Sequence, residues 1–386
     1  MELYFDTAST TKPKKEVIDA MKPYIYDKWY NPSSLYGNAQ CVKRDIDKAK
    51  KRIANFINAE ADEIYFTSGG SESNSWAIQG FCHYWNKKEI KPIIITTTIE
   101  HKSIMNCVDN AIADVKFISV DKCGFVNLNE LENILKDSVE TPTLVSVQYA
   151  NNEIGTIQHI NKISELAHKY ESVFHTDAVQ AFGKIPIDVK NNGIDLMSVS
   201  GHKIGVPKGI GFLYIKNGIK ISPLIYGTQM NGMRGGTENV AGIIGMKKAI
   251  ELISLSDIII KTTIRSSMID SLQYNFPCII NGSVCDKFAL PDIISVTFEK
   301  DISGESLVYL LDTSGIYISS GSACNSHSDL PSYVLKAIGL SDAESRRTIR
   351  ISLDSLLDGT VEEMENSVFK LLFEMKRQIT LLSLGE

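Results

Sequence analysis

A single cysteine, Cys324, lies in a run of serine, glycine and alanine, SSGSACNSHS at residues 319–328. A structural cysteine is usually packed among apolar side chains, whereas small polar neighbours are typical of an exposed loop. Reactive cysteines act as thiolates from partly exposed positions. The residues around Cys324 therefore raise the hypothesis of a thiol with a chemical role, and the alternative is an incidental loop cysteine.

A lysine follows an expected buried strand in the stretch SVSGHKIGVPKG, residues 198–209. Lysine is rarely buried without a partner, and its amine forms a Schiff base when it is held near a carbonyl cofactor. Pyridoxal 5′-phosphate (PLP) is the cofactor that requires this bond. Ser200 and His202 flank Lys203 and are placed to bind an anionic oxygen. The alternative for Lys203 is a solvated loop residue.

The pyridinium nitrogen of PLP needs a carboxylate that keeps it protonated, so that the ring withdraws electrons. Asp177, in the stretch FHTDAVQAFGK, stands at the carboxyl end of an expected strand. Gln180 follows three residues later and can hydrogen-bond the 3′ oxygen of the ring. The other interpretation of Asp177 is a helix N-cap.

Three more motifs meet the remaining needs of PLP. The stretch EIYFTSGGSESNSWAI predicts a strand, a turn and a helix start, where Gly70 and Ser71 would bind the phosphate. His101 in TTTIEHKSI would stack on the ring and move protons, and Asn152 in NNEIG would contact ring or substrate. The alternative for Gly70 and Ser71 is a common Gly/Ser turn between a strand and a helix. His101 could instead be a loop histidine without a role, and Asn152 a turn residue.

These groups share one position in the expected fold, because each directly follows a strand. They are residues 69–71, 101, 151–152, 177–180 and 200–203. In open α/β sheets, ligands bind at the carboxyl ends of the strands. The five groups together therefore predict one PLP site at that edge of the sheet.

Short β-rich runs alternate with amphipathic helical segments from about residue 62 to 216. The runs are at 63–67, 92–98, 115–120, 143–148, 172–176, 195–200 and 211–215, and two of the helical segments are at 128–137 and 160–170. Several runs are apolar throughout, as in strands that are buried on both faces of a parallel sheet. This alternation predicts a wound α/β domain.

The pattern changes after residue 240. A long helical stretch at about 240–275 leads to expected strands and helices at 293–299, 304–312, 315–321, from Pro331, at 347–353 and at about 360–380. These predict a smaller α+β domain. We expect a large PLP-binding domain at 13–257 and a small domain at 258–386, which residues 1–12 join and which carries the cysteine loop.

The bulk composition limits the classes of function. A chain of 386 residues is long enough for two domains. Its net charge of −6 argues against a nucleic-acid partner, and no apolar run approaches the ~20 residues of a membrane helix. No signal peptide is visible. Seven scattered cysteines predict reduced thiols in the cytoplasm and no metal site.

Taken together, the motifs resemble those of cysteine desulfurases of the NifS/IscS type. The motifs that carry this resemblance are FTSGGSES, IEHKSI, NNEIG, HTDAVQ, SGHKIG, RGGTENV and SSGSAC, and it extends from DTASTT at residues 6–11 to the last helix. These enzymes are PLP-dependent transferases of the class V aminotransferase family, with the aspartate aminotransferase-like fold called fold type I. The resemblance therefore implies an α/β fold with a mainly parallel central sheet.

The resemblance implies the cofactor roles given above, with the Schiff base on Lys203. It adds Thr237 of RGGTENV, which would reach the phosphate of the neighbouring subunit and make the active unit a homodimer. It also implies that Asn152 and Arg350 bind the α-carboxylate of the substrate. The planar guanidinium of Arg350 suits a carboxylate, although a structural arginine is the alternative.

The activity implied is the removal of sulfur from L-cysteine, which gives L-alanine and a persulfide on Cys324. The sulfur would pass to an acceptor protein for iron–sulfur cluster or other thio-cofactor biosynthesis. Tyr36 and the segments 226–232 and 326–332 depart from the usual pattern of the family. Two alternatives are a selenocysteine lyase or other PLP enzyme of the same fold, and a non-catalytic sulfur-relay partner.

Overall fold

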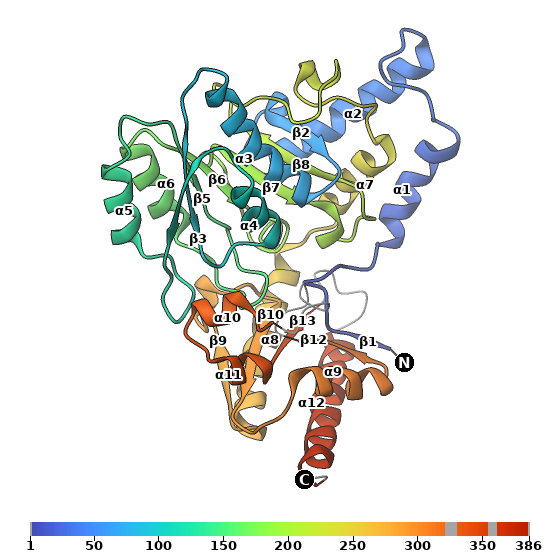
Figure 1. Cartoon of the computed structure of the whole chain (residues 1–386). Helices are drawn as coiled ribbons and strands as arrows, with labels where there is room; N and C mark the ends of the chain where they lie inside the picture. Colours follow the sequence, from blue (N-terminus) through green and yellow to red (C-terminus); the bar gives the residue numbers. More distant parts are fainter. Residues whose placement is uncertain (1, 321–329, 354–360, 385–386) are drawn as a thin grey trace.

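The computed structural model describes residues 2–320, 330–353 and 361–384. Figure 1 shows two sheets in separate parts of the molecule, with the larger sheet above the smaller one and both chain ends beside the smaller one. Each sheet has an apolar core of its own. The predicted combination of a large α/β unit and a smaller α+β unit is confirmed, while the boundary at residues 257 and 258 stays a prediction.

The central sheet has seven strands in the order β2-β8-β7-β6-β5-β3-β4. They are β2 (Ile64–Thr67), β3 (Ile93–Thr97), β4 (Asp114–Ile118), β5 (Thr143–Ser146), β6 (Val173–Asp177), β7 (Leu196–Ser200) and β8 (Gly211–Ile215). The sheet is mainly parallel, as predicted, but β8 runs antiparallel to both β2 and β7. A parallel neighbour would need a crossover of a dozen or more residues, and only ten residues, 201–210, separate β7 from β8.

Helices cover both faces of the central sheet (Figure 1). One face packs against α1 (Lys15–Tyr26), α2 (Gly37–Phe56), α5 (Leu128–Lys136), α6 (Ile160–Lys169) and α7 (Val240–Glu251), and the other against α3 (Gly70–Asn86) and α4 (Lys102–Asp109). Ile94 and Ile95 belong to opposite faces, and both are fully buried. Burial on both faces is the reason why several of these strands, such as β3, consist mainly of apolar residues.

The small sheet has four antiparallel strands in the order β12-β13-β10-β9. They are β9 (Cys278–Asn281), β10 (Ile293–Phe298), β12 (Ser319–Ser320) and β13 (Thr348–Ser352). Its core includes residues of α8 (Leu255–Asn275), α9 (Gly304–Thr313) and α12 (Val361–Leu384). Further elements are the short helices α10 (Tyr333–Ala337) and α11 (Asp342–Arg346) and the 3₁₀ turns Ala61–Glu63, Gly201–Lys203, Met230–Gly232 and Asp286–Phe288.

Two segments differ from the expectation. The helical stretch at 240–275 is two helices, because the Ser254 hydroxyl accepts a hydrogen bond from Ser256 N and begins α8 separately from α7. The expected strand at 315–321 is divided between two sheets. β11 (Ile316–Tyr317) pairs in parallel with β1 (Leu3–Tyr4), whereas β12 pairs with β13. The N-terminal segment supplies the second partner strand, which local sequence does not reveal.

Across residues 2–320, 330–353 and 361–384, none of the helices combines the length and the apolar character needed to cross a membrane. Each cysteine in these ranges is a free thiol: Cys41, Cys82, Cys107, Cys123, Cys278 and Cys285.

Candidate active site

A cavity of about 310 Å³ lies at the carboxyl ends of the strands in the central sheet. It brings together ten of the residues predicted for the site, from five separate loops of the central sheet and from the small sheet. They are Gly70, Ser71, His101, Asn152, Asp177, Gln180, Ser200, His202, Lys203 and Arg350. Because the strands that precede these loops are parallel, their carboxyl ends meet at one edge.

Lys203 lies three residues after the end of β7, in the 3₁₀ turn Gly201–Lys203. Its amine is held at the cavity by the N-terminal segment. Nζ donates to the backbone oxygen of Ser9 at 2.7 Å and to that of Ala8. A lysine that is held by backbone carbonyls at a cavity wall is not the solvated loop residue of the alternative interpretation.

Asp177 is the last residue of β6, and its side chain is almost fully buried at the cavity wall. Oδ1 accepts from Val179 N at 2.9 Å, and Oδ2 accepts from Asn74 Nδ2 at 2.7 Å. No helix begins at Asp177, so the N-cap interpretation is wrong, and the bond to Val179 N forms a local turn. The two donors fix the carboxylate where it can face a protonated ring nitrogen.

The start of α3 and the loop after β7 meet at the cavity. A Cβ atom added at Gly70 would lie 2.6 Å from Val179 Cγ2, so the packing at this helix start has room only for glycine. Burial, together with the charges of Lys203 and Lys208, lowers the pKa of His202 to about 4. His202 is therefore neutral near pH 7. Backbone N–H groups of a helix start are typical ligands of a phosphate.

His101 is the N-cap residue of α4, and its ring lines the cavity. Nδ1 accepts a hydrogen bond from Ser103 N at 3.1 Å, so the hydrogen of the neutral ring is assigned to Nε2. Burial lowers the pKa of His101, and the neighbouring Asp177 carboxylate partly offsets this effect. His101 is thus a neutral donor at the cavity.

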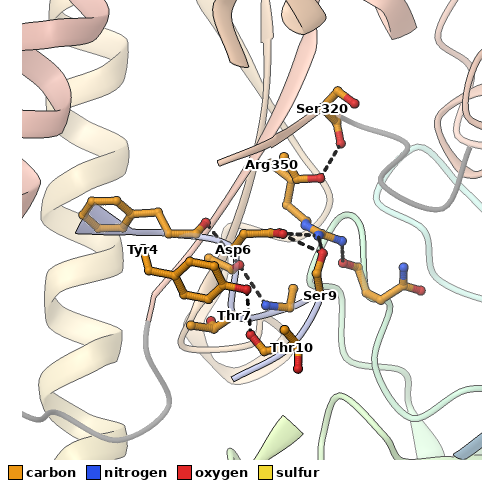
Figure 2. A network of polar contacts seen from close by, with 12 residues as sticks. Tyr4, Asp6, Thr7, Ser9, Thr10, Ser320 and Arg350 are labelled. Carbon is orange, nitrogen blue, oxygen red and sulfur yellow. Dashed lines mark hydrogen bonds and ion pairs between the residues drawn. The ribbon is translucent and has the colours of Figure 1, made fainter. Parts of the chain in front are cut away.

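Arg350, on β13, brings the small sheet to the cavity (Figure 2). Nη2 donates to Asp6 Oδ1 and to Ser9 Oγ, each at 2.8 Å, and Nη1 donates to Asn152 O at 3.0 Å. Arg350 Nε is buried and has no hydrogen-bond partner among the described residues. A buried cation with an unused donor at a cavity is suited to bind an anionic ligand.

Two predicted site residues are not among those that line the cavity. Thr237 is exposed in the loop before α7. Cys324 lies outside the described residues, which end at Ser320 on this side of the gap. Ser319 and Ser320, the last described residues before the gap, pair with Arg350 and Ile349 of β13.

The cavity also contains residues that the sequence did not indicate. Asn74 holds Asp177 and lies one helical turn after Gly70, so the i, i+4 spacing of α3 was a usable signal. Ala8 and Ser9 contact Lys203 through backbone oxygens. Such contacts do not depend on the side chain, so no residue type could have predicted them.

The set of donors fits PLP. It combines a primary amine, a buried carboxylate, a helix start next to a serine and a neutral histidine around one cavity, which are the groups that an aldehyde, a ring nitrogen and a phosphate require. Asn74 Oδ1 and Arg350 Nε are buried at this cavity and have no partner in the described chain. Unpaired polar atoms at a cavity wall are expected where a polar ligand binds.

Comparison with known proteins gives the family. Residues 3–365 match the family Aminotransferase class-V. The cysteine desulfurase IscS of Methanosarcina thermophila is 44% identical over 358 residues, which are 91% of this chain and 87% of that protein. A solved NifS-like protein is 32% identical, with a TM-score of 0.88 over 99% of this chain and 100% of its own.

A second solved structure, SspA in complex with cysteine, is 35% identical, with a TM-score of 0.80 over 92% of this chain and 99% of its own. These matches cover both sheets and the whole cavity. They confirm the resemblance inferred from the motifs and the fold that it implied. This chain belongs to the class V aminotransferases, a family whose cofactor is PLP, and within it to the cysteine desulfurases of the IscS/NifS type.

Proposed function

We propose that this chain removes sulfur from L-cysteine with PLP, releases L-alanine and retains the sulfur as a persulfide on Cys324. The observation that carries the proposal is the convergence of Lys203, Asp177 and Arg350 on one cavity. An amine, a carboxylate and a guanidinium at one site are the groups that a PLP enzyme needs to bind its cofactor and an amino acid.

The residues of the cavity would hold PLP from all sides. Lys203 would bind it as a Schiff base, Asp177 would face the ring nitrogen and Gln180 the 3′ oxygen, while His101 would stack on the ring. Phosphate ligands would come from Gly70, Ser71, Ser200 and His202. When bound, PLP withdraws electrons from the Cα atom of the amino acid.

Arg350 would bind the α-carboxylate of the substrate, together with Asn152. The unused Nε of Arg350 supports this role, because it leaves one N–H group of the guanidinium for an anionic ligand. The similarity to SspA, whose structure is a complex with cysteine, supports an amino acid of this kind as the substrate.

Proton and sulfur transfer would then be divided between two residues. The Lys203 amine, once the substrate has displaced it from the cofactor, would take the proton from the substrate's Cα. The Cys324 thiolate attacks the substrate's Sγ, so that an S–S bond forms while the Cβ–Sγ bond breaks and its electron pair stays on Cβ. Protonation of Cβ and the return of the proton from Lys203 to Cα complete L-alanine, and the persulfide is one of the reversible oxidation states of a thiol.

The active unit would be a homodimer in which Thr237 reaches the phosphate of the second subunit. Thr237 is exposed in a single chain, as this role requires. Large apolar side chains are exposed on α1 and in the loop before α2: Ile25, Tyr26, Trp29, Leu35 and Tyr36. A group of this kind is typical of a protein–protein interface.

The persulfide sulfur would pass to an acceptor protein in iron–sulfur cluster or other thio-cofactor biosynthesis. The relationship to proteins named IscS supports this destination. The free thiols of the described cysteines suit a reducing compartment such as the cytoplasm. A selenocysteine lyase would retain Lys203 and Asp177 but would not need Cys324 in the same way.

The Cys324→Ala variant tests the proposal. We expect it to keep the visible absorbance of bound PLP and to lose sulfide and persulfide formation from L-cysteine, because only the sulfur acceptor is removed. Cys285→Ala is the control, since Cys285 is an exposed free thiol away from the cavity. Undiminished turnover of L-cysteine by Cys324→Ala would point instead to an enzyme of the selenocysteine lyase kind.

A further inference from the structure

Lys184 and Asp292 form a buried ion pair next to the cavity. Lys184 Nζ lies 2.7 Å from Asp292 Oδ2, and the two side chains are 2% and 1% exposed. Lys184 belongs to the turn that follows β6, and Asp292 directly precedes β10, so the pair joins the central sheet to the small sheet. A buried ion pair often contributes no net free energy to folding. We therefore look for its role in the other contacts that the two side chains make.

The Lys184 ammonium also donates to Gln180 Oε1 at 2.9 Å. An ammonium has three hydrogens to donate and cannot accept, so only the oxygen of the Gln180 amide can face it. The amide nitrogen must then point the other way. There it donates to the backbone oxygen of Ala8 at 2.9 Å, the same oxygen that accepts from Lys203.

We propose that Lys184, held in place by Asp292, fixes the Gln180 amide so that its N–H groups face the cavity. Lys184 and Asp292 are thus positioning residues for the cofactor, and the inference rests on the proposed function, in which Gln180 donates to the 3′ oxygen of PLP. Without a cation beside its oxygen, the amide group can rotate by 180°, because its two ends have nearly the same shape. The oxygen, an acceptor, would then face the cavity.

Asp292 is needed because its carboxylate, with Oδ2 2.7 Å from Nζ, holds the Lys184 ammonium in place. Neither carboxylate oxygen of Asp292 has a hydrogen-bond partner among the described residues, so Oδ2 faces Lys184 as an ion pair. Its backbone oxygen accepts from Leu353 N at 2.8 Å, just after β13, which ties the pair to the strand of Arg350. Arg265 is a further buried cation, and its Nε donates to the backbone oxygen of Ile293, the residue after Asp292, at 3.0 Å. Removal of one partner alone would leave a buried charge, so a test must change both.

The test uses the double variant Lys184→Met/Asp292→Asn, the single variant Gln180→Ala and the triple variant that combines them. The control is Lys190→Met/Glu60→Gln, which removes an exposed ion pair with a distance of 2.8 Å. For each holoprotein we would measure the dissociation constant of PLP and the visible absorption band of the bound cofactor. A merely structural ion pair would not change that band.

We expect the double variant and Gln180→Ala each to shift the band and to weaken PLP binding by about fivefold, as for the loss of one hydrogen bond. Because Lys184 acts through Gln180, the triple variant should be no weaker than Gln180→Ala alone. If the double variant does not fold, Lys184→Gln/Asp292→Asn replaces it, since a neutral amide pair keeps hydrogen bonding in the buried site.

The positioning role alone would be overturned by either of two results. One is a triple variant in which the losses of PLP affinity from the double variant and from Gln180→Ala multiply. The other is a double variant with the absorption band and PLP affinity of the wild type. A wild-type protein that binds no PLP would overturn the proposed function and, with it, this inference. The two failures are thus distinguishable in one experiment.

Discussion

The side chains around the cavity differ in how firmly the fold holds them. The Asp177 carboxylate accepts two hydrogen bonds, and the Nδ1 atom of His101 accepts one from Ser103 N. The Lys203 amine is held by backbone oxygens of the N-terminal segment. Lys203 is only half-buried, and the Ala8 oxygen still accepts from Gln180 Nε2 when the lysine is replaced.

Lys203→Ala should therefore fold but should not retain PLP covalently. We expect the rate of alanine formation from L-cysteine to fall by roughly 10²–10⁴-fold, because an essential acid–base group is removed. Absorbance of the protein after gel filtration and a discontinuous alanine assay measure the two effects. Lys208→Ala is the matched control, since Lys208 is exposed in the same loop. Equal losses in both variants would contradict the role of Lys203.

At the scale of elements, one helix start links the two sheets. Ser332, the N-cap of α10, accepts from Leu335 N at 3.3 Å and donates to Glu153 Oε2 at 2.5 Å. Glu153 follows β5 of the central sheet, and burial raises its pKa to about 7. The Ser332 hydroxyl thus hydrogen-bonds both a buried carboxyl group and a backbone N–H group at the start of the helix.

Ser332→Ala should cost about 2–4 kcal/mol of the free energy of unfolding at pH 8, where Glu153 is largely ionised. The loss of a cap contributes about 1 kcal/mol, and the unsatisfied buried carboxyl group adds roughly 1–3 kcal/mol. Ser303→Ala is the control, because Ser303 caps α9 at an exposed position without a carboxylate partner. Urea unfolding measures both variants, and equal costs would show that Glu153 plays no part.

His175, in the middle of β6, sets a dependence of stability on pH. Its ring nitrogens lie 2.9 Å from Ser146 Oγ and from Ser198 Oγ, and complete burial lowers its pKa to about 3. Histidine in an unfolded chain titrates near 6.5. Below that pH the unfolded chain binds a proton that the folded chain does not, so stability falls as the pH decreases from about 6.5 towards 3.

His175→Gln removes this contribution. One proton corresponds to about 1.4 kcal/mol per pH unit, so between pH 7 and 5 the wild type should lose about 2 kcal/mol more than the variant. His101 and His202 titrate in both proteins and cancel in the comparison. Urea unfolding at the two pH values measures the difference, and curves that stay parallel would contradict the prediction.

At the scale of the whole molecule, the exposed apolar side chains near α1 and α2 lie on the large unit, the unit that also carries Thr237. Trp29 and Leu35 are 68% and 94% exposed in one chain. A second subunit that covers them would remove this apolar surface from water, and burial of such side chains is worth about 1.5–3 kcal/mol each.

Trp29→Glu/Leu35→Glu should therefore convert a dimer into a monomer, as light scattering on the purified protein would measure. The monomer should also bind PLP more weakly, because the phosphate would lose the contact from Thr237 of the second subunit. Tyr309→Glu is the control, since Tyr309 is 72% exposed on α9 of the small unit. A double variant that stays dimeric would place the interface elsewhere.

The sequence alone determined which residues end the strands of the central sheet, because buried parallel strands are apolar throughout and the polar residues that follow them stand out. Asp177, Lys203 and His101 could be found in this way, as each depends on the segment that contains it. The tertiary structure decided what no local pattern contains: the division of residues 316–320 between two sheets, the hydrogen bonds from Lys203 to the backbone oxygens of Ala8 and Ser9, and the ion pair between Lys184 and Asp292. Those contacts join segments that are distant along the chain, and several are made by backbone atoms, which are the same in every residue.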